Sequence, residues 1–173
     1  MDGFHPDISA LQSAITERSK FIVINSPNNP TGGAFPKEDL IEIIAALKDS
    51  AIIILDEAYA EFSAQGSLVE ELKNYPNLII LRTLSKAYSL AGVRMGACLC
   101  HDESFITFLQ QKIMETYPLP RPAIEAAMIA LAPENKKQIQ ENMQKALAET
   151  KKLKTYFEKS PLVQTVYPTD ANF

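Results

Sequence analysis

The chain has 173 residues, of which 46% are hydrophobic and 22% are charged, and its formal net charge at pH 7 is −4. This length and composition are typical of one globular domain, so extensive disorder is not expected. No apolar run approaches the roughly 20 residues that span a bilayer, and the first residues lack the basic and apolar regions of a secretion signal. Two cysteines cannot form a disulfide scaffold, and the acidic balance argues against nucleic-acid binding. We therefore expect a cytoplasmic protein with neither a membrane nor a nucleic-acid partner.

Short apolar runs alternate with helical segments along the first half of the chain. The runs are residues 21–24, 51–55 and 78–81. Continuous apolar runs of this length are typical of strands that are covered on both faces of a parallel sheet. Residues 36–48 have helical spacing, with Pro36 at the first helical position, and residues 67–75 predict a shorter helix. This order predicts an α/β protein with a mainly parallel sheet and flanking helices.

The second half of the chain is expected to be mostly helical. Residues 96–100 predict a fourth strand, and its short connection to the third favours an antiparallel arrangement. Helices are predicted over residues 103–115, 123–132 and 134–159. Residues 162–167 predict a last strand, which follows Ser160-Pro161.

Polar residues follow each of the three apolar runs. The polar clusters are residues 28–32, 56–59 and 83–86. In open α/β sheets, ligands bind where the carboxyl ends of parallel strands meet. We therefore expect the three clusters to converge on one site, although they are far apart in the sequence.

Asp56 follows a predicted buried strand, where a carboxylate without a partner is costly. Apolar residues followed by Asp56-Glu57 are typical of a Walker-B element, so Asp56 could hold magnesium in an NTPase. It could instead pair with a cationic ring nitrogen of a bound cofactor, or cap the following turn. The NTPase alternative requires a G-x-x-x-x-G-K-[ST] loop, and this sequence contains none.

Lys86 follows a Thr-Leu-Ser turn at a predicted strand end, where a lysine can act as a nucleophile towards carbonyl groups. The alternative is an ordinary surface lysine. The hydroxyl groups of Thr83 and Ser85, the turn N–H groups and the Arg94 guanidinium together have the chemistry of a phosphate site. This combination favours a functional interpretation of Lys86.

Three other features have both a structural and a functional interpretation. The loop 28–32 is a turn by composition, and one of its asparagine amides could donate to a ligand oxygen. The phenol of Tyr59 could lie near the same ligand, or Tyr59 could be an aromatic side chain at the rim. Cys98 and Cys100 would share one face of the fourth strand, so we expect them in the core and expect no metal site.

These motifs together resemble those of the fold-type-I pyridoxal phosphate (PLP) aminotransferases. The matching segments are residues 26–32 (SPNNPTG), 56–59 (DEAY) and 85–86 (SK), with Arg94 eight residues after the lysine. Longer stretches are most similar to the histidinol-phosphate aminotransferase family. These stretches are residues 56–62, 82–96 and 117–119. An aromatic aminotransferase, a threonine-phosphate decarboxylase and a non-catalytic module that kept the fold remain as alternatives.

The resemblance implies roles for individual residues. Lys86 would bond covalently to PLP and later carry the proton between the substrate α-carbon and the cofactor C4′. Asp56 would pair with the pyridine nitrogen, while Asn29 and Tyr59 would hydrogen-bond the ring O3′. The cofactor phosphate would be held by Thr83, Ser85 and Arg94. Catalysis would thus depend on Lys86, Asp56 and Tyr59.

The resemblance also implies a domain organisation and an activity. Residues 1–159 would be part of the PLP-binding large domain, and residues 160–173 would begin a truncated C-terminal small domain. The longer family members would pass an amino group from an amino donor, histidinol phosphate, to a 2-oxo acid, 2-oxoglutarate, in histidine biosynthesis, and would act as homodimers. The chain would be an internal fragment without the glycine-containing phosphate loop and the substrate-binding arginine. We therefore expect it to be inactive alone.

Overall fold

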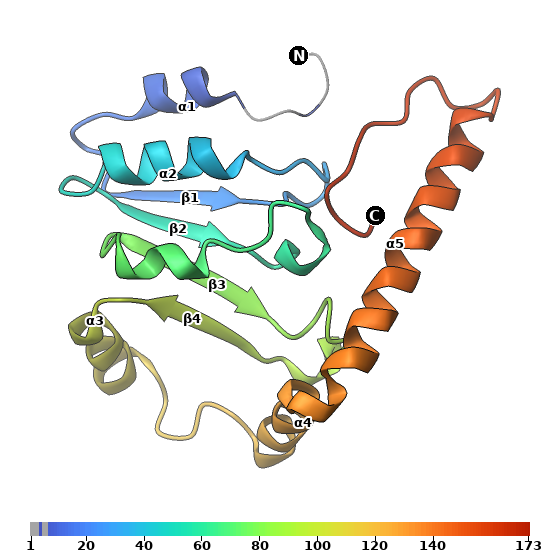
Figure 1. The fold of residues 1–173 in the computed structure, drawn as a ribbon. Coiled ribbons are helices and arrows are strands. Elements are labelled where there is room, and N and C mark those ends of the chain that lie inside the picture. The colour runs from blue at the N-terminus through green and yellow to red at the C-terminus, as the bar shows by residue number, and fades with distance from the viewer. Residues whose placement is uncertain (1–3, 5–6) are drawn as a thin grey trace.

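In the computed structural model, which describes residue 4 and residues 7–173, four strands form one mixed sheet in the order β1-β2-β3-β4 (Figure 1). The strands are β1 (Phe21–Asn25), β2 (Ile52–Asp56), β3 (Leu78–Thr83) and β4 (Gly96–Cys100). The first three are parallel, and β4 pairs with β3 in the antiparallel direction. The predicted α/β class and the orientation of all four strands are confirmed.

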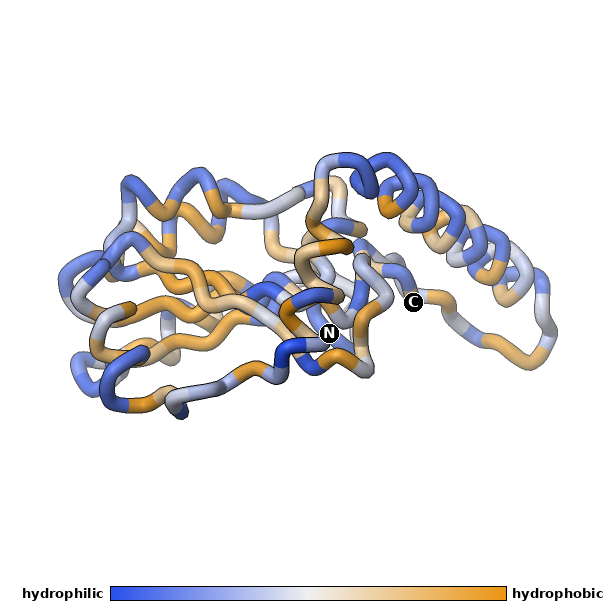
Figure 2. Tube along the Cα trace, turned by 90° about the horizontal axis from the view of Figure 1, so that it is seen from below, coloured by the Kyte–Doolittle hydropathy of each residue, from blue (hydrophilic) through white to orange (hydrophobic). Residues whose placement is uncertain are grey.

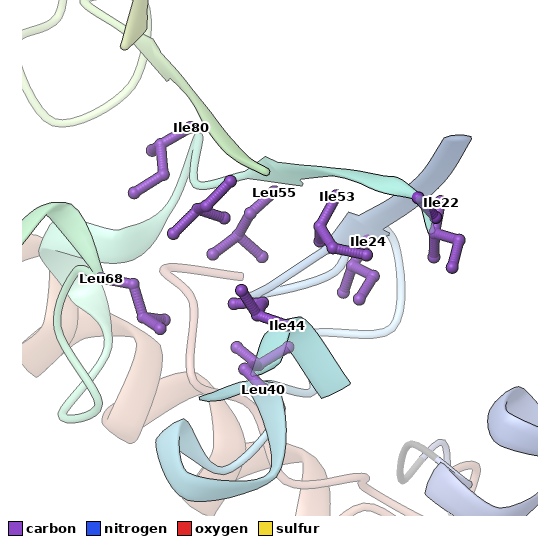
Figure 3. Close-up of a cluster of buried hydrophobic side chains, with 10 residues drawn as sticks. Ile22, Ile24, Leu40, Ile44, Ile53, Leu55, Leu68 and Ile80 are labelled. Carbon is purple, nitrogen blue, oxygen red and sulfur yellow. The ribbon is translucent and has the colours of Figure 1, made fainter. Parts of the chain in front are cut away.

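Helix α2 covers one face of the sheet. It spans Lys37–Ala46, so it begins one residue after the predicted Pro36, which caps it instead. Its Leu40 and Ile44 point toward the isoleucine and leucine side chains of β1, β2 and β3 (Figure 3). Apolar residues at alternate positions of each strand supply this layer, since successive side chains point to opposite faces. The crossover between β2 and β3 contains the second predicted helix as a 3-10 helix, Val69–Lys73.

The opposite face of β1 is open, which differs from the prediction that the strands are covered on both faces. Ile22 and Ile24 are buried, whereas Phe21 and Val23 are 64% and 68% exposed. An apolar run makes a strand suitable for burial on both faces. It does not indicate whether the protein has helices to cover the second face of the sheet. Helix α1 (Ile8–Ala14), which has no counterpart among the predicted elements, adds side chains to the same covered face as α2.

The predicted helices of the second half are present with changed bounds. Helix α3 (Glu103–Phe108) continues into a π-helical turn at Leu109–Ile113, and α4 spans Arg121–Leu131. The predicted helix 134–159 consists of a 3-10 turn at Pro133–Asn135 and the long helix α5 (Lys136–Glu158). Most of the α5 trace is coloured as hydrophilic in Figure 2, and the lysine side chains of α5 are exposed, as expected for a solvated helical face.

The prediction of a strand at residues 162–167 is wrong. This segment forms turns and irregular structure, and Leu162 is 93% exposed. Apolar residues in sequence form a strand only where another strand offers hydrogen-bonding partners. The chain instead returns from α5 towards the carboxyl end of β1 (Figure 1), where the Asp170 amide donates to the Gly32 carbonyl at 2.8 Å.

Across the helices that the structure describes, none combines the length and apolar character needed to cross a membrane.

Candidate active site

The carboxyl ends of β1, β2 and β3 bring the three polar clusters to one edge of the sheet. In the strand register, Asn25 of β1 lies beside Asp56 of β2, and Asp56 lies beside Leu81 of β3. The loop 28–32 leaves the end of β1, and Lys86 follows the end of β3. The predicted convergence therefore rests on the parallel pairing of these strands.

Tyr59 is the residue at which the three clusters meet. The side-chain amide of Asn29 donates to the Tyr59 hydroxyl at 2.8 Å, and the Lys86 ammonium lies 5.2 Å from the centroid of the Tyr59 ring. Tyr59 is 6% exposed, whereas Lys86 is exposed. Because Asn29 donates to the phenol oxygen, the phenol keeps its own proton for a ligand. The structure thus brings Asn29, Tyr59 and Lys86 together, as the sequence predicts.

A small apolar cluster holds Tyr59 in place. Tyr59 packs with Phe62, Ala87 and Ala171, and the ring of Phe173 meets the Tyr59 ring edge-on with centroids 5.1 Å apart. Side chains of α5 lie against the same cluster. These are Met143, Ala146 and Leu147. The contacts from Ala171 and Phe173 are not predictable from spacing, since more than 100 residues separate them from Tyr59.

Asp56 ends β2 and caps the turn that follows it. One carboxylate oxygen, Oδ1, accepts from the Ala58 amide at 2.9 Å, and the side chain is only partly buried. Capping was one interpretation that the sequence left open. It uses one of the two carboxylate oxygens, so the other can still face a cation. Within the described part of the chain, no hydrogen bond or ion pair joins Asp56 to Lys86.

The predicted phosphate residues are brought together in part. The Thr83 hydroxyl accepts from the Ser85 amide at 3.1 Å, so both hydroxyl-bearing residues belong to one tight turn. Arg94 has a left-handed backbone, with φ of 58°, and its exposed guanidinium donates to the Ala91 carbonyl at 3.1 Å. Arg94 closes the 3-10 helix Ala91–Val93 in this way, and no hydrogen bond of the described chain links it to Thr83 or Ser85.

Glu57 points away from this edge, into the protein. It is 1% exposed and accepts hydrogen bonds from the Leu68 amide at 2.7 Å and from the Ser67 hydroxyl. Arg82 donates to Glu57 at 3.3 Å and also forms an ion pair with Glu61. A Glu57 bound in this way is not available as the second acid of a Walker-B element, which argues against the NTPase alternative.

Burial and charge both affect the protonation of this ion network. Burial raises the pKa of Glu57, and the hydrogen bonds from Leu68 and Ser67 and the charge of Arg82 only partly oppose that rise. For Arg82, burial acts to lower the pKa, but the hydrogen bond and charge of Glu61, together with the charge of Glu57, raise it overall. Arg82 therefore stays cationic across the physiological range.

The prediction that Cys98 and Cys100 lie in the core is wrong. Cys98 is exposed and Cys100 is only partly buried, because they lie on the face of β4 opposite to Leu99, which packs against the core. Partial burial raises the pKa of both thiols, which keeps them protonated and weakly nucleophilic. Among residue 4 and residues 7–173, no group of three or more histidine, cysteine or acidic side chains could hold a metal ion.

Comparisons with known proteins identify a family for this chain. The family model "Aminotransferase class I and II" matches residues 1–173. The chain is 42% identical over 154 residues to histidinol-phosphate aminotransferase 2 of Idiomarina loihiensis, and 39% identical over 154 residues to histidinol-phosphate aminotransferase 1 of Pasteurella multocida. Each alignment covers 89% of this chain but only 42% and 43%, respectively, of the relative. The chain thus spans less than half the length of these curated relatives.

A solved structure of a histidinol-phosphate aminotransferase has a similar fold. Histidinol-phosphate aminotransferase of Sinorhizobium meliloti, determined in complex with pyridoxal-5'-phosphate, superimposes with a TM-score of 0.83 at 29% identity. The match covers 95% of this chain and 44% of that protein.

Proposed function

We propose, since the chain belongs to the aminotransferase class I and II family, that it carries the lysine-bearing part of a PLP site in a histidinol-phosphate aminotransferase. The observation that supports this most directly is the meeting of Asn29, Tyr59 and Lys86 at the carboxyl edge of the sheet. The names of the curated relatives favour histidinol phosphate as the amino donor over the substrates of an aromatic aminotransferase or a threonine-phosphate decarboxylase. A 2-oxo acid, 2-oxoglutarate, would be the acceptor.

The donor and acceptor groups at this edge fit PLP. Among the described residues, the Tyr59 phenol donates to no partner and the second carboxylate oxygen of Asp56 accepts from none. Thr83 and Ser85 bring two hydroxyl groups into one turn, in which the Thr83 hydroxyl donates to the Met95 carbonyl at 3.4 Å and still has a lone pair. These groups match a ring oxygen, a protonated ring nitrogen and a phosphate, respectively. When bound, PLP supplies an electron sink for the negative charge that develops at the substrate α-carbon.

Each proposed site residue would then have a distinct role. The Lys86 amine would hold PLP covalently and would carry a proton to and from the substrate α-carbon. The Asp56 carboxylate would keep the proton on the ring nitrogen, and Asn29 and Tyr59 would orient the ring through its oxygen. Arg94 would complete the phosphate site after its guanidinium leaves the Ala91 carbonyl.

The organisation of the whole protein is part of the same proposal. Residues 1–159 would belong to the large domain, and residues 160–173 would begin the small domain. The whole protein would act as a cytoplasmic homodimer. Because the chain spans 42% and 43% of the relatives above, we expect no turnover of histidinol phosphate by the 173-residue chain alone.

Covalent labelling tests the role of Lys86. The chain is incubated with one equivalent of PLP, reduced with borohydride and digested, and the labelled peptide is identified by mass spectrometry. We expect the label on Lys86, its loss in Lys86→Ala, and its retention in the control Lys152→Ala, whose lysine pairs with Glu149 on the surface of α5. A label spread evenly over the other lysines would contradict the proposal.

A further inference from the structure

A buried charged network lies behind the candidate active site. Successive strand residues point to opposite faces of a sheet. Glu57 directly follows β2, and its amide still donates to the Leu81 carbonyl of β3 at 3.0 Å, so Glu57 lies on the face opposite to its neighbour Asp56. In the same way, Arg82 lies on the face opposite to its neighbour Thr83. The ion pair between Glu57 and Arg82 therefore connects the residue after Asp56 to the residue before Thr83, and both Asp56 and Thr83 are proposed to bind the cofactor.

Arg82 also fixes the segment that presents Tyr59. Its guanidinium binds Glu57 through Nη1 and Glu61 through Nη2, and these two glutamates stand on either side of Tyr59 in the sequence. The segment between them includes the start of the 3-10 helix Ala60–Phe62, whose first residue donates its amide to the Glu57 carbonyl at 3.2 Å. One side chain from the end of β3 thus holds both ends of the turn that follows β2.

Other contacts attach this network to the crossover after the turn. The Arg82 guanidinium also donates to the Ser67 hydroxyl at 3.1 Å, and the Leu68 amide donates to Glu57 at 2.7 Å. Glu57, Glu61 and Arg82 are together well shielded from water, with side-chain exposures of 1%, 13% and 23%. The network is therefore a connected unit and not a set of surface ion pairs.

Net stabilisation does not account for this network well. Removing three charged groups from water offsets much of their mutual attraction, and apolar residues of similar volume often stabilise a core as well. Within the described chain, the Nε of Arg82 is buried without a hydrogen-bond partner, which adds a further cost. What the forked guanidinium does provide is a fixed geometry between two carboxylates, one bound at each Nη.

We propose that Glu57, Glu61 and Arg82 are positioning residues of the PLP site. They hold the turn bearing Tyr59 against the strand that leads into Thr83, Ser85 and Lys86, so the ring-binding and lysine-bearing segments keep their relative positions. The consequence for PLP rests on the proposed function, whereas the restraint on the turn does not.

The test uses the double variant Glu57→Gln/Arg82→Met. Gln keeps an oxygen that accepts from the Leu68 amide, and Met keeps an unbranched side chain without charge, so no buried ion remains at positions 57 and 82. The Glu61 carboxylate, which is 13% exposed, loses its ion-pair partner in this variant, and that loss is part of the loosening that the test measures. The matched control is Glu125→Gln/Arg121→Met, which removes an ion pair of α4 with side chains 58% and 88% exposed. A third variant, Arg82→Lys, keeps the charge but lacks the forked donor.

Two readouts are measured on each folded variant. The first is hydrogen exchange of the Ala60 and Phe62 amides, which are hydrogen-bonded in the turn, compared with the amides of Ile53 and Ile80 inside the sheet. We expect exchange in the turn to accelerate about tenfold in the double variant, with the sheet amides and the control unchanged. The second is the Kd for PLP, measured by absorbance, which we expect to rise about tenfold, as for other supporting residues behind a binding site.

Each outcome decides a separate question. Unchanged exchange of Ala60 and Phe62 in the folded double variant would overturn the restraint itself. Faster exchange with an unchanged Kd for PLP would overturn the link to the cofactor site. If the unmodified chain fails to carry PLP on Lys86, the proposed function fails, while the exchange measurement still decides whether the network holds the turn. Arg82→Lys should give intermediate values in both readouts, and values equal to those of the unmodified chain would refute the need for a forked donor.

Discussion

Replacing Gly32 by alanine tests how tightly the end of the chain is docked beside the candidate site. Gly32 has φ of +77°, and a methyl group added to it would lie 2.7 Å from the Cβ of Thr169. The left-handed backbone costs an alanine about 1 kcal/mol. Forcing a methyl group into a filled space adds about 1–3 kcal/mol. We therefore expect Gly32→Ala to lower the free energy of unfolding by about 2–4 kcal/mol in total.

Gly66 provides the matched control for this substitution. Its φ is +68°, but no atom of residue 4 or of residues 7–173 lies within 4 Å of the position that a methyl group would take. Gly66→Ala should thus lower the free energy of unfolding by only about 1 kcal/mol, the backbone contribution alone. Urea denaturation measures both values, and adding Thr169→Gly to Gly32→Ala should restore part of the loss. Equal losses for the two alanine variants would refute the docking of Thr169 against Gly32.

Two further predictions concern the covered face of the sheet and the ion network. Ile24→Ala should lower the free energy of unfolding by about 2–5 kcal/mol in urea denaturation because Ile24 is only 4% exposed, whereas Val23→Ala, at an exposed position of the same strand, should change it by less than about 0.5 kcal/mol; similar losses would contradict the one-sided burial of β1. Burial raises the pKa of the Glu57 carboxyl group, so the folded chain binds a proton there more tightly than the unfolded chain does. The stabilisation of the fold by this proton is present at low pH and is lost as the pH rises through the raised pKa. The free energy of unfolding of Glu57→Gln should accordingly depend less on pH in this acidic range, and equal pH slopes would contradict the assignment.

The sequence predicts the sheet and the place of the site for the same reason. The β-branched apolar runs at residues 21–24, 51–55 and 78–81 favour strands locally, and their helical connections require parallel pairing. Once the strands are parallel, their polar ends must share an edge, so the meeting of Asn29, Tyr59 and Lys86 follows from local patterns.

The wrong predictions all depend on partners that a local pattern does not contain. Residues 162–167 have the composition of a strand, but the part of the chain that the structure describes offers them no neighbouring strand and places no covering layer over the Cys98 face of β4. The packing of Phe173 on Tyr59 and the two-sided binding by Arg82 are likewise tertiary contacts. None of them has a periodic signal in the sequence.

The docking of the last residues beside Gly32 has a consequence for the order of folding. The Asp170 carboxylate accepts from the Ala34 amide across 136 residues, so this contact closes a loop that contains most of the 173-residue chain. Contacts of such large sequence separation form slowly, because the loss of chain entropy comes before their stabilisation. The βαβ unit of β1, α2 and β2 can form from much shorter loops. The surroundings of Tyr59 should therefore be completed late in folding, and the aromatic contact from Phe173 would report the final step.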